Sequence, residues 1–142
     1  MSTEFYSRPV IHVVDDDESM RMALIELLRT VGFDTIGYRS TGEFLLNSLS
    51  DKHGCLLLDI QLSGPSGLEL QAALIRRGVA VPIIFLTGHA DVSSRVHAIK
   101  AGAIDLLEKP VARETLFEAM ERALASDIAR RNTSNAQFAK RY

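Results

Sequence analysis

The sequence predicts an α/β fold in which five strands alternate with five helices. Short apolar runs rich in β-branched residues recur five times, and each precedes a segment with the apolar periodicity of an amphipathic helix. Within these runs the apolar residues are continuous, which is typical of strands buried on both faces of a sheet. We therefore expect a doubly wound, parallel, five-stranded sheet with right-handed crossovers and helices on both faces.

The expected strands are bounded by turn residues and helix caps. They cover residues 10–14, 34–39, 55–59, 81–87 and 103–110. The run VIHVV is expected to form a buried strand, and the run CLLLD is strongly apolar.

The expected helices carry recognisable start and stop residues. They cover residues 19–33, 40–49, 66–78, 91–102 and 112–131. Gly32 closes the first helix. Ser40 or Thr41 caps the second, where Glu43 could complete a capping box. The stretch GPSG at 64–67 turns the chain into the third helix, since it lacks the lysine and spacing of a phosphate-binding loop.

Composition and charge narrow the class of protein. The chain has 142 residues, of which 46% are hydrophobic and 24% charged, as expected for one globular domain. No apolar run approaches the ~20 residues that span a bilayer, and no secretory signal is recognisable, so we expect a cytoplasmic protein without membrane contact. Cys55 is the only cysteine, which excludes an internal disulfide. The net charge of −2 argues against non-specific nucleic-acid binding.

The chain is expected to divide into a domain over residues 9–125 and a linker or tail over residues 126–142. The second part is basic, with four arginine or lysine residues and the single acid Asp127. From residue 132 onward the apolar periodicity fades, which is typical of a frayed tail or a linker.

Acidic residues follow two of the most apolar strands. Asp15 and Asp16 end the first strand, and Asp59 ends the third. Ligands of open α/β sheets bind beyond the carboxyl ends of the strands, and neighbouring strands lie only ~4.8 Å apart. Crowded carboxylates there would repel one another, and a hard cation such as Mg²⁺ would relieve the repulsion. Alternatively, Asp17, and possibly Asp16, could simply cap the first helix.

The motifs VVDDDES, CLLLDIQ, FLTGHAD and LLEKP resemble, in their order and strand context, the receiver domain of two-component response regulators. The resemblance covers about residues 9–125. It implies a flavodoxin-like or CheY-like fold with strand order 2-1-3-4-5. It also implies a signalling phosphoacceptor that assists its own phosphorylation and dephosphorylation, and is not a conventional enzyme.

The resemblance assigns a phosphoacceptor and a metal site. Asp59 would accept a phosphoryl group from a phosphohistidine of a sensor histidine kinase. Asp15, Asp16 and Asp59, with the backbone carbonyl of Gln61, would hold Mg²⁺ or Mn²⁺. A carboxylate nucleophile and a hard divalent cation suit phosphoryl transfer, which needs positioning and charge neutralisation.

The resemblance assigns three further roles near this edge of the sheet. Thr87 and Lys109 would bind the phosphoryl oxygens, and movement of Thr87 would carry the signal into its loop. The Lys109–Pro110 peptide would be cis. His89, together with Gln61, would influence hydrolysis of the phosphoryl group. Each of these residues could also have no role in phosphoryl binding. Thr87 would then only end its strand, Lys109 would be a surface lysine, and His89 would be a solvated loop residue.

Two positions depart from the usual receiver pattern. Leu62 and Ser63 stand where Met-Pro is usual, and Leu106 stands where an aromatic residue usually rotates on activation. Neither departure touches the acids, Thr87 or Lys109. Switching is then expected to depend on Thr87 and backbone movement.

The stretch HGCLLLD, the GHADV loop and the long fifth helix resemble the FixJ/NarL class, in which a helical linker joins the receiver to a LuxR-type helix-turn-helix. No such motif fits residues 126–142. The chain is then the receiver part of a transcription regulator that contacts DNA only through an attached domain, or else a stand-alone receiver. Phosphorylation would promote homodimerisation through the face of the fourth helix, fifth strand and fifth helix. The family places there Val92, Val96, Ile99, Lys100, Leu106, Leu116 and Phe117, and some of these apolar residues are expected to belong to the core.

Two other classes of protein share some of these sequence features. A dehalogenase-like phosphatase would use an acid pair spaced like Asp15 and Asp17, but the chain lacks room for the usual cap. A pseudo-receiver would act as an interaction module without phosphorylation, which the departures at Leu106 and Ser63 leave open.

Overall fold

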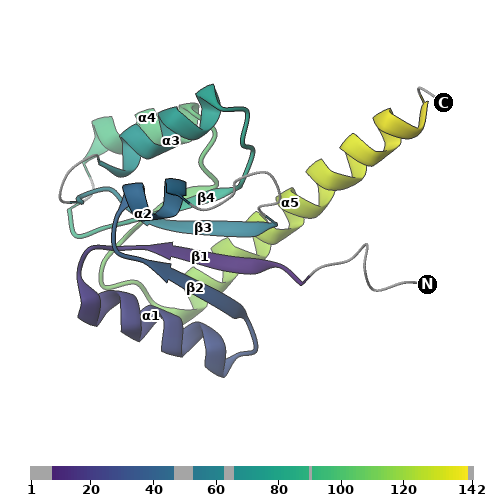
Figure 1. Cartoon of the computed structure of the whole chain (residues 1–142). Helices are drawn as coiled ribbons and strands as arrows, with labels where there is room; N and C mark the ends of the chain where they lie inside the picture. Colours follow the sequence, from purple (N-terminus) through teal and green to yellow (C-terminus); the bar gives the residue numbers. More distant parts are fainter. Residues whose placement is uncertain (1–7, 47–52, 63–65, 90, 141–142) are drawn as a thin grey trace.

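The structure is a computed structural model that describes residues 8–46, 53–62, 66–89 and 91–140, with side chains described as far as residue 132. Five parallel strands form one sheet in the order β2-β1-β3-β4-β5, and five helices alternate with them along the chain (Figure 1). The predicted fold class and strand order are confirmed. None of the described helices is both long enough and apolar enough to cross a membrane.

The elements lie close to the predicted ranges. The strands are β1 Val10–Val14, β2 Asp34–Tyr38, β3 Gly54–Asp59, β4 Ile83–Thr87 and β5 Asp105–Glu108. The helices are α1 Glu18–Thr30, α2 Thr41–Leu46, α3 Gly67–Arg76, α4 Val92–Lys100 and α5 Arg113–Lys140. The end expected for the second helix, and Ser63, lie outside the described residues.

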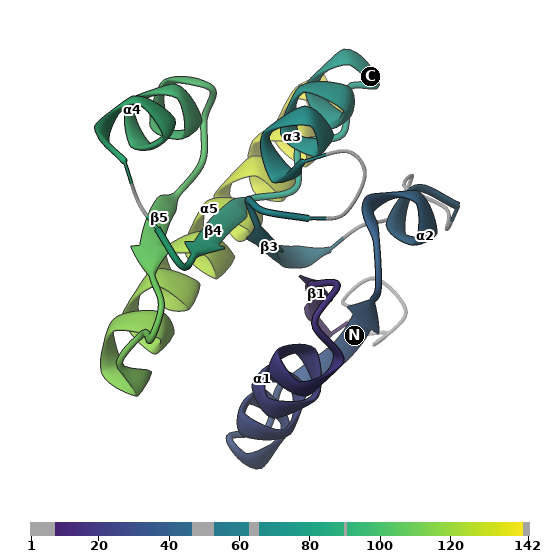
Figure 2. The ribbon, with the colours of Figure 1, turned by 90° about the vertical axis from the view of Figure 1, so that its left-hand side faces the viewer.

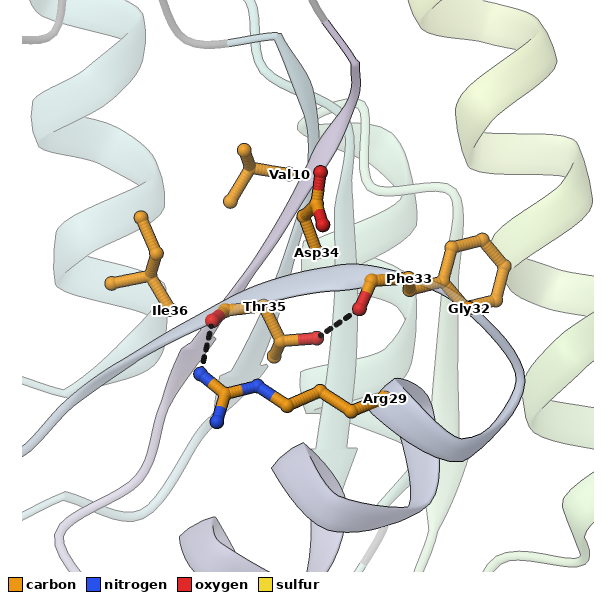
Figure 3. Close-up of a pocket in the computed structure, with 7 residues that line it drawn as sticks. All are labelled: Val10, Arg29, Gly32, Phe33, Asp34, Thr35 and Ile36. Carbon is orange, nitrogen blue, oxygen red and sulfur yellow. Dashed lines mark hydrogen bonds between the residues drawn. The ribbon is translucent and has the colours of Figure 1, made fainter.

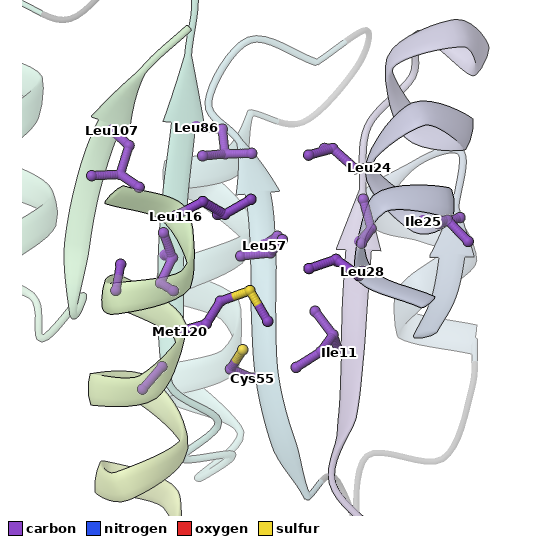
Figure 4. Close-up of a cluster of buried hydrophobic side chains, with 14 residues drawn as sticks. Ile11, Leu24, Ile25, Leu28, Cys55, Leu57, Leu86, Leu107, Leu116 and Met120 are labelled. Carbon is purple, nitrogen blue, oxygen red and sulfur yellow. The ribbon is translucent and has the colours of Figure 1, made fainter. Parts of the chain in front are cut away.

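The sheet is buried on both faces, as the continuous apolar runs predict. Alternate residues of each strand point to opposite sides. In β3, Leu57 packs in the cluster formed with α1 and α5, whereas Leu56 and Leu58 pack in the cluster formed with α2, α3 and α4. Figure 2 shows these helices on the two sides of the sheet, and Figure 4 shows Leu57 between side chains of α5 and α1.

Side-chain caps fix where the first two helices begin. The Met20 N–H donates to Asp17 Oδ1 (3.1 Å), so Asp17 caps α1, which is the plainer of its two readings. The Glu43 N–H donates to Ser40 Oγ (3.1 Å), so Ser40 is the residue that caps α2. These caps start each helix directly after a strand end, which holds the connecting loops at the carboxyl edge of the sheet.

Helix α5 is longer than the sequence predicted. It continues to Lys140 instead of ending at residue 131, and its last turns extend past the sheet (Figure 1). Asp127, beyond the expected boundary at residue 125, is fully buried. Packing of α5 on the sheet therefore reaches at least to Asp127.

Candidate functional site

The strand register places two predicted acids side by side. Val14 of β1 pairs with Leu58 of β3, so the next residue of each strand, Asp15 and Asp59, lies at the same carboxyl edge. Their exposures are only 2% and 9%. Buried carboxylates need a nearby positive charge to stay ionised. The two acids at this edge of the sheet therefore favour a positive charge beside them.

Lys109 supplies that positive charge from a different strand. It follows β5, and its Nζ donates to Asp59 Oδ2 (2.9 Å) and to Asp15 Oδ2 (3.2 Å). Its backbone N–H donates to the Thr87 carbonyl (2.7 Å), which fixes the loop that carries it. The Lys109–Pro110 peptide is cis, as the family resemblance implied. The structure thus unites three of the predicted site residues in one hydrogen-bonded trio.

Two residues of the trio, Asp15 and Lys109, have shifted pKa values. Burial raises the pKa of Asp15 above its ordinary value, although the Asp17 N–H (2.9 Å) and the Lys109 ammonium act in the opposite direction. Burial lowers the pKa of Lys109, but Asp59 and Asp15 outweigh it and leave that pKa raised. With both carboxylates ionised, one ammonium does not neutralise the trio. A further cation would therefore be favoured here.

Asp16 and Gln61 lie beside the trio and are both exposed. The Gln61 N–H donates to Asp59 Oδ1 (2.9 Å), which holds the start of the β3–α3 loop against the phosphoacceptor candidate. Among the described residues, no group of three His, Cys, Asp or Glu side chains is arranged to hold a metal ion. Mg²⁺ does not need such a group, because it commonly takes one or two carboxylates and completes its shell with water and phosphate oxygens. The oxygens of Asp15 and Asp59 fit that requirement.

Thr87 is buried at the end of β4, but its hydroxyl faces its own loop. Thr87 Oγ1 donates to the His89 carbonyl (3.2 Å) and accepts from the His89 N–H (3.3 Å). No hydrogen bond between this hydroxyl and Asp59 or Lys109 is found in the described part of the chain. His89 itself is exposed. Both Thr87 bonds are long, so the hydroxyl is weakly held.

The expected dimer face is only partly on the surface. Val92, Val96 and Ile99 are 79%, 45% and 42% exposed. Lys100 is exposed too, and Phe117 is half-buried. Leu106 and Leu116 are core residues of 1% and 0% exposure, so they are among the apolar residues of this face that were expected to belong to the core. Leu106 is the register partner of Phe85 in β4. Its side chain is buried because it lies on the face of the sheet that α3 and α4 cover.

Gly67 is a site-shaping residue whose role the sequence reading did not identify. It starts α3, and a Cβ built on it would lie 2.4 Å from the Asp59 carbonyl oxygen. The Gly67 N–H also donates to the Ile60 carbonyl (3.0 Å). Only glycine therefore permits this approach of α3 to the backbone of the phosphoacceptor candidate. The last glycine of GPSG was the available sequence signal.

An ionic cluster around the buried Asp127, at the opposite end of β3, was also missed. Asp127 of α5 accepts from the Gly54 N–H (3.0 Å), is 2.5 Å from His53 Nδ1, and pairs with Arg131 (3.3 Å) and Arg130. Burial would raise the pKa of Asp127, but the hydrogen bonds from Arg130, Gly54 and His53 outweigh it and leave the pKa lowered. The cluster holds α5 against the start of the strand that ends in Asp59.

A surface cavity of about 460 Å³ lies beside the start of β2, away from Asp15 and Asp59 (Figure 3). Its polar groups are engaged locally: Arg29 donates to the Thr35 carbonyl (3.0 Å), and Thr35 donates to the Phe33 carbonyl (3.3 Å). Asp34 pairs with Arg8 (3.3 Å). No pair of carboxylates converges there, so the chemistry is concentrated at the carboxyl edge.

Comparison with known proteins agrees with this geometry. The family described as the response regulator receiver domain matches residues 11–121. Nodulation protein W of Bradyrhizobium diazoefficiens is 41% identical, over 91% of this chain and 57% of that protein. The transcriptional regulatory protein FixJ of Azorhizobium caulinodans is 35% identical, over 92% of this chain and 63% of that protein.

A solved structure of the response regulator StyR superposes with a TM-score of 0.87 at 39% identity, covering 94% of this chain and 67% of that one. The chain spans a little over half the length of the curated relatives it matches. Receiver domains are signalling proteins, generally not catalytic enzymes, and the family generally binds Mg²⁺. The acids at the carboxyl edge, the matched residues and the shared fold together show that this chain belongs to the response regulator receiver domain family.

Proposed function

We propose that Asp59 accepts a phosphoryl group from a phosphohistidine of a sensor histidine kinase, with Mg²⁺ or Mn²⁺ bound at the same edge of the sheet. The observation that supports this best is the trio, in which two buried carboxylates share the Lys109 ammonium. In this reaction an Asp59 carboxylate oxygen forms a bond to phosphorus while the bond between phosphorus and the histidine nitrogen breaks. The imidazole leaves and takes up a proton.

The chain supplies positioning and charge for that transfer. Lys109 already contacts Asp59 Oδ2, so its ammonium can pass to an oxygen of the incoming phosphoryl group. The Gln61 N–H holds Asp59 Oδ1 and orients the carboxylate. A divalent cation held by Asp15, Asp16, Asp59 and the Gln61 carbonyl would neutralise the remaining negative charge.

The signal would leave the site through Thr87. Its hydroxyl makes two long hydrogen bonds to the His89 backbone, which it can exchange for one shorter bond to a phosphoryl oxygen. That exchange would move the loop at 87–89 and shift the chain toward an active conformation. His89, exposed at this loop, and Gln61 would then influence how fast water removes the phosphoryl group. Because Leu106 is a buried aliphatic residue, backbone movement carries the change without an aromatic rotation.

The output would be transcriptional and cytoplasmic. The FixJ relative is named a transcriptional regulatory protein, and the chain covers only part of it. In this proposal residues 9–125 form the receiver, and residues 126–142, helical as far as Lys140, link it to a DNA-binding domain. Phosphorylation would promote homodimerisation through the exposed residues Val92, Val96, Ile99 and Lys100.

Labelling with acetyl phosphate and Mg²⁺ tests the acceptor. We expect one acid-stable, alkali-labile phosphoryl group per wild-type chain, and none in Asp59→Asn, measured by intact mass. Asp34→Asn is the matched control, because Asp34 is an exposed acid at the amino end of β2. Labelling that persists in Asp59→Asn would refute the assignment. An unlabelled wild-type chain would instead favour a pseudo-receiver.

A further inference from the structure

We propose that Arg21 is a positioning residue that fixes the β1–α1 loop so that its acids can hold the divalent cation. The inference rests on the proposed function, because it concerns the same cation site. It adds a residue from α1 that does not itself contact the cation, and it gives that residue a stated mechanism.

Arg21 is a charged side chain placed inside the fold. It is only 8% exposed, and its guanidinium NH1 donates to the backbone carbonyl of Asp15 (2.8 Å). A guanidinium keeps its charge at all physiological pH values, so burying it is costly unless it is well hydrogen-bonded. The hydrogen bond to the Asp15 carbonyl, in the β1–α1 loop, therefore offsets part of the cost of burying Arg21.

That carbonyl controls the direction of the next residue. The Asp15 carbonyl and the Asp16 N–H belong to one planar peptide unit. When Arg21 holds the Asp15 carbonyl oxygen, it also fixes the orientation of the peptide plane that joins Asp15 to Asp16. On the other side, the Asp17 N–H donates to Asp15 Oδ1 (2.9 Å), and Asp17 caps α1 through Met20. Asp16 is thus held between two fixed neighbours.

Strand β2 leaves room for the Arg21 stem. Gly37 lies in the interior of β2, where glycine weakens a strand unless a close approach requires it. A Cβ built on Gly37 would lie 3.2 Å from Arg21 Cδ, 3.3 Å from Arg21 Cγ and 2.5 Å from Ile25 Cδ1. The glycine therefore leaves room beside β2 for two side chains of α1, Ile25 at the closest approach and the Arg21 stem next to it.

Two simpler roles for Arg21 predict different outcomes. A merely structural arginine would change stability but leave the cation affinity of the folded chain unchanged. A merely electrostatic arginine would repel the cation, so its removal would raise the affinity for Mg²⁺. Only a positioning role predicts that neutralising Arg21 weakens Mg²⁺ binding.

The test is calorimetric titration of Mg²⁺ alone into the full chain, with thermal unfolding measured in parallel. We expect Arg21→Met, which keeps most of the apolar stem, to weaken Mg²⁺ binding about tenfold, as is usual when a group that orients a metal ligand is lost. Arg21→Lys, which keeps the charge and a donor, should recover most of the affinity. Arg29→Met is the control, because Arg29 is an exposed arginine of the same helix that bonds to Thr35 instead.

Equal or tighter Mg²⁺ binding by Arg21→Met would overturn the inference, and so would an equal loss in Arg29→Met. If Arg21→Met does not fold, the double variant Gly37→Ala/Ile25→Val decides, because it removes the 2.5 Å clash with Ile25 Cδ1 and leaves the Arg21 stem crowded at 3.2 Å without changing charge: weaker Mg²⁺ binding supports the inference, and unchanged binding overturns it. A wild-type chain that binds no Mg²⁺ would overturn the proposed function and this inference together. Wild-type binding with unaffected variants would overturn the inference alone.

Discussion

At the scale of single residues, Lys109 is the counter-ion of two carboxylates that reach the sheet edge from different strands. In the proposed function Asp59 is the nucleophile of this trio. Asp15 carries a costly charge, because burial raises its pKa. A site of this kind trades stability for function. The ionised Asp15 should therefore destabilise the metal-free fold.

Asp15→Asn should raise the melting temperature of the metal-free protein at pH 7. The folded pKa of Asp15 lies above the ~3.9 of an unfolded aspartate, so its ionisation favours unfolding. The stability associated with Asp15 is therefore greatest below about pH 3.9 and is lost as the pH rises through the folded pKa. Thermal unfolding in EDTA at several pH values measures this. The advantage of Asn should shrink toward pH 4, and a lower melting temperature at pH 7 would contradict the account.

Gly67→Ala should destabilise the chain by about 1–3 kcal/mol, the usual cost of forcing an extra methyl group into a packed site. The new Cβ would meet the Asp59 carbonyl oxygen at 2.4 Å, so backbone has to move. Urea unfolding measures the loss, and Gly42→Ala is the control because its Cβ meets only Ser40 Oγ, at 3.8 Å. Equal stability of the two variants would show that α3 does not need this close approach.

At the scale of elements, α5 is fastened at the end of the sheet opposite the site. Asp127 joins α5 to His53 and Gly54 at the start of β3, while Asp59 stands at the other end of the same strand. A strand is stiff along its hydrogen-bonded length. The cluster therefore gives α5 a fixed orientation relative to the strand that ends in Asp59.

Asp127→Asn should cost about 1–3 kcal/mol at pH 7, the penalty of leaving buried donors poorly paired. The pKa of Asp127 is lowered in the fold, so its contribution is fully present above the unfolded value of ~3.9 and is lost as the pH falls through the folded pKa. The difference from the wild type should therefore shrink in acid. Urea unfolding at pH 7 and near pH 3 tests this, and a pH-independent difference would contradict it.

Across the whole molecule, the sequence was sufficient to predict the ten elements and the acids at the sheet edge, because both depend on local patterns. Apolar periodicity reports packing, and strand ends locate the ligand edge. The Asp127 cluster could not be predicted in this way, because it joins residues 73 and 74 positions apart. The length of α5 was missed for a related reason, since its last turns extend past the sheet and need no apolar stripe. The direction of the Thr87 hydroxyl depends on loop geometry that residue types do not specify.

The central claim is that Asp15, Asp59 and Lys109 form one pocket for a divalent cation and a phosphoryl group. A crystal structure of the chain with Mg²⁺ and beryllium fluoride, which mimics a phosphoryl group on a carboxylate, tests it most directly. The account predicts beryllium on an Asp59 oxygen, the Lys109 ammonium on a fluorine, and Mg²⁺ beside Asp15. Beryllium fluoride bound to another carboxylate, or Lys109 turned away from the bound group, would contradict it.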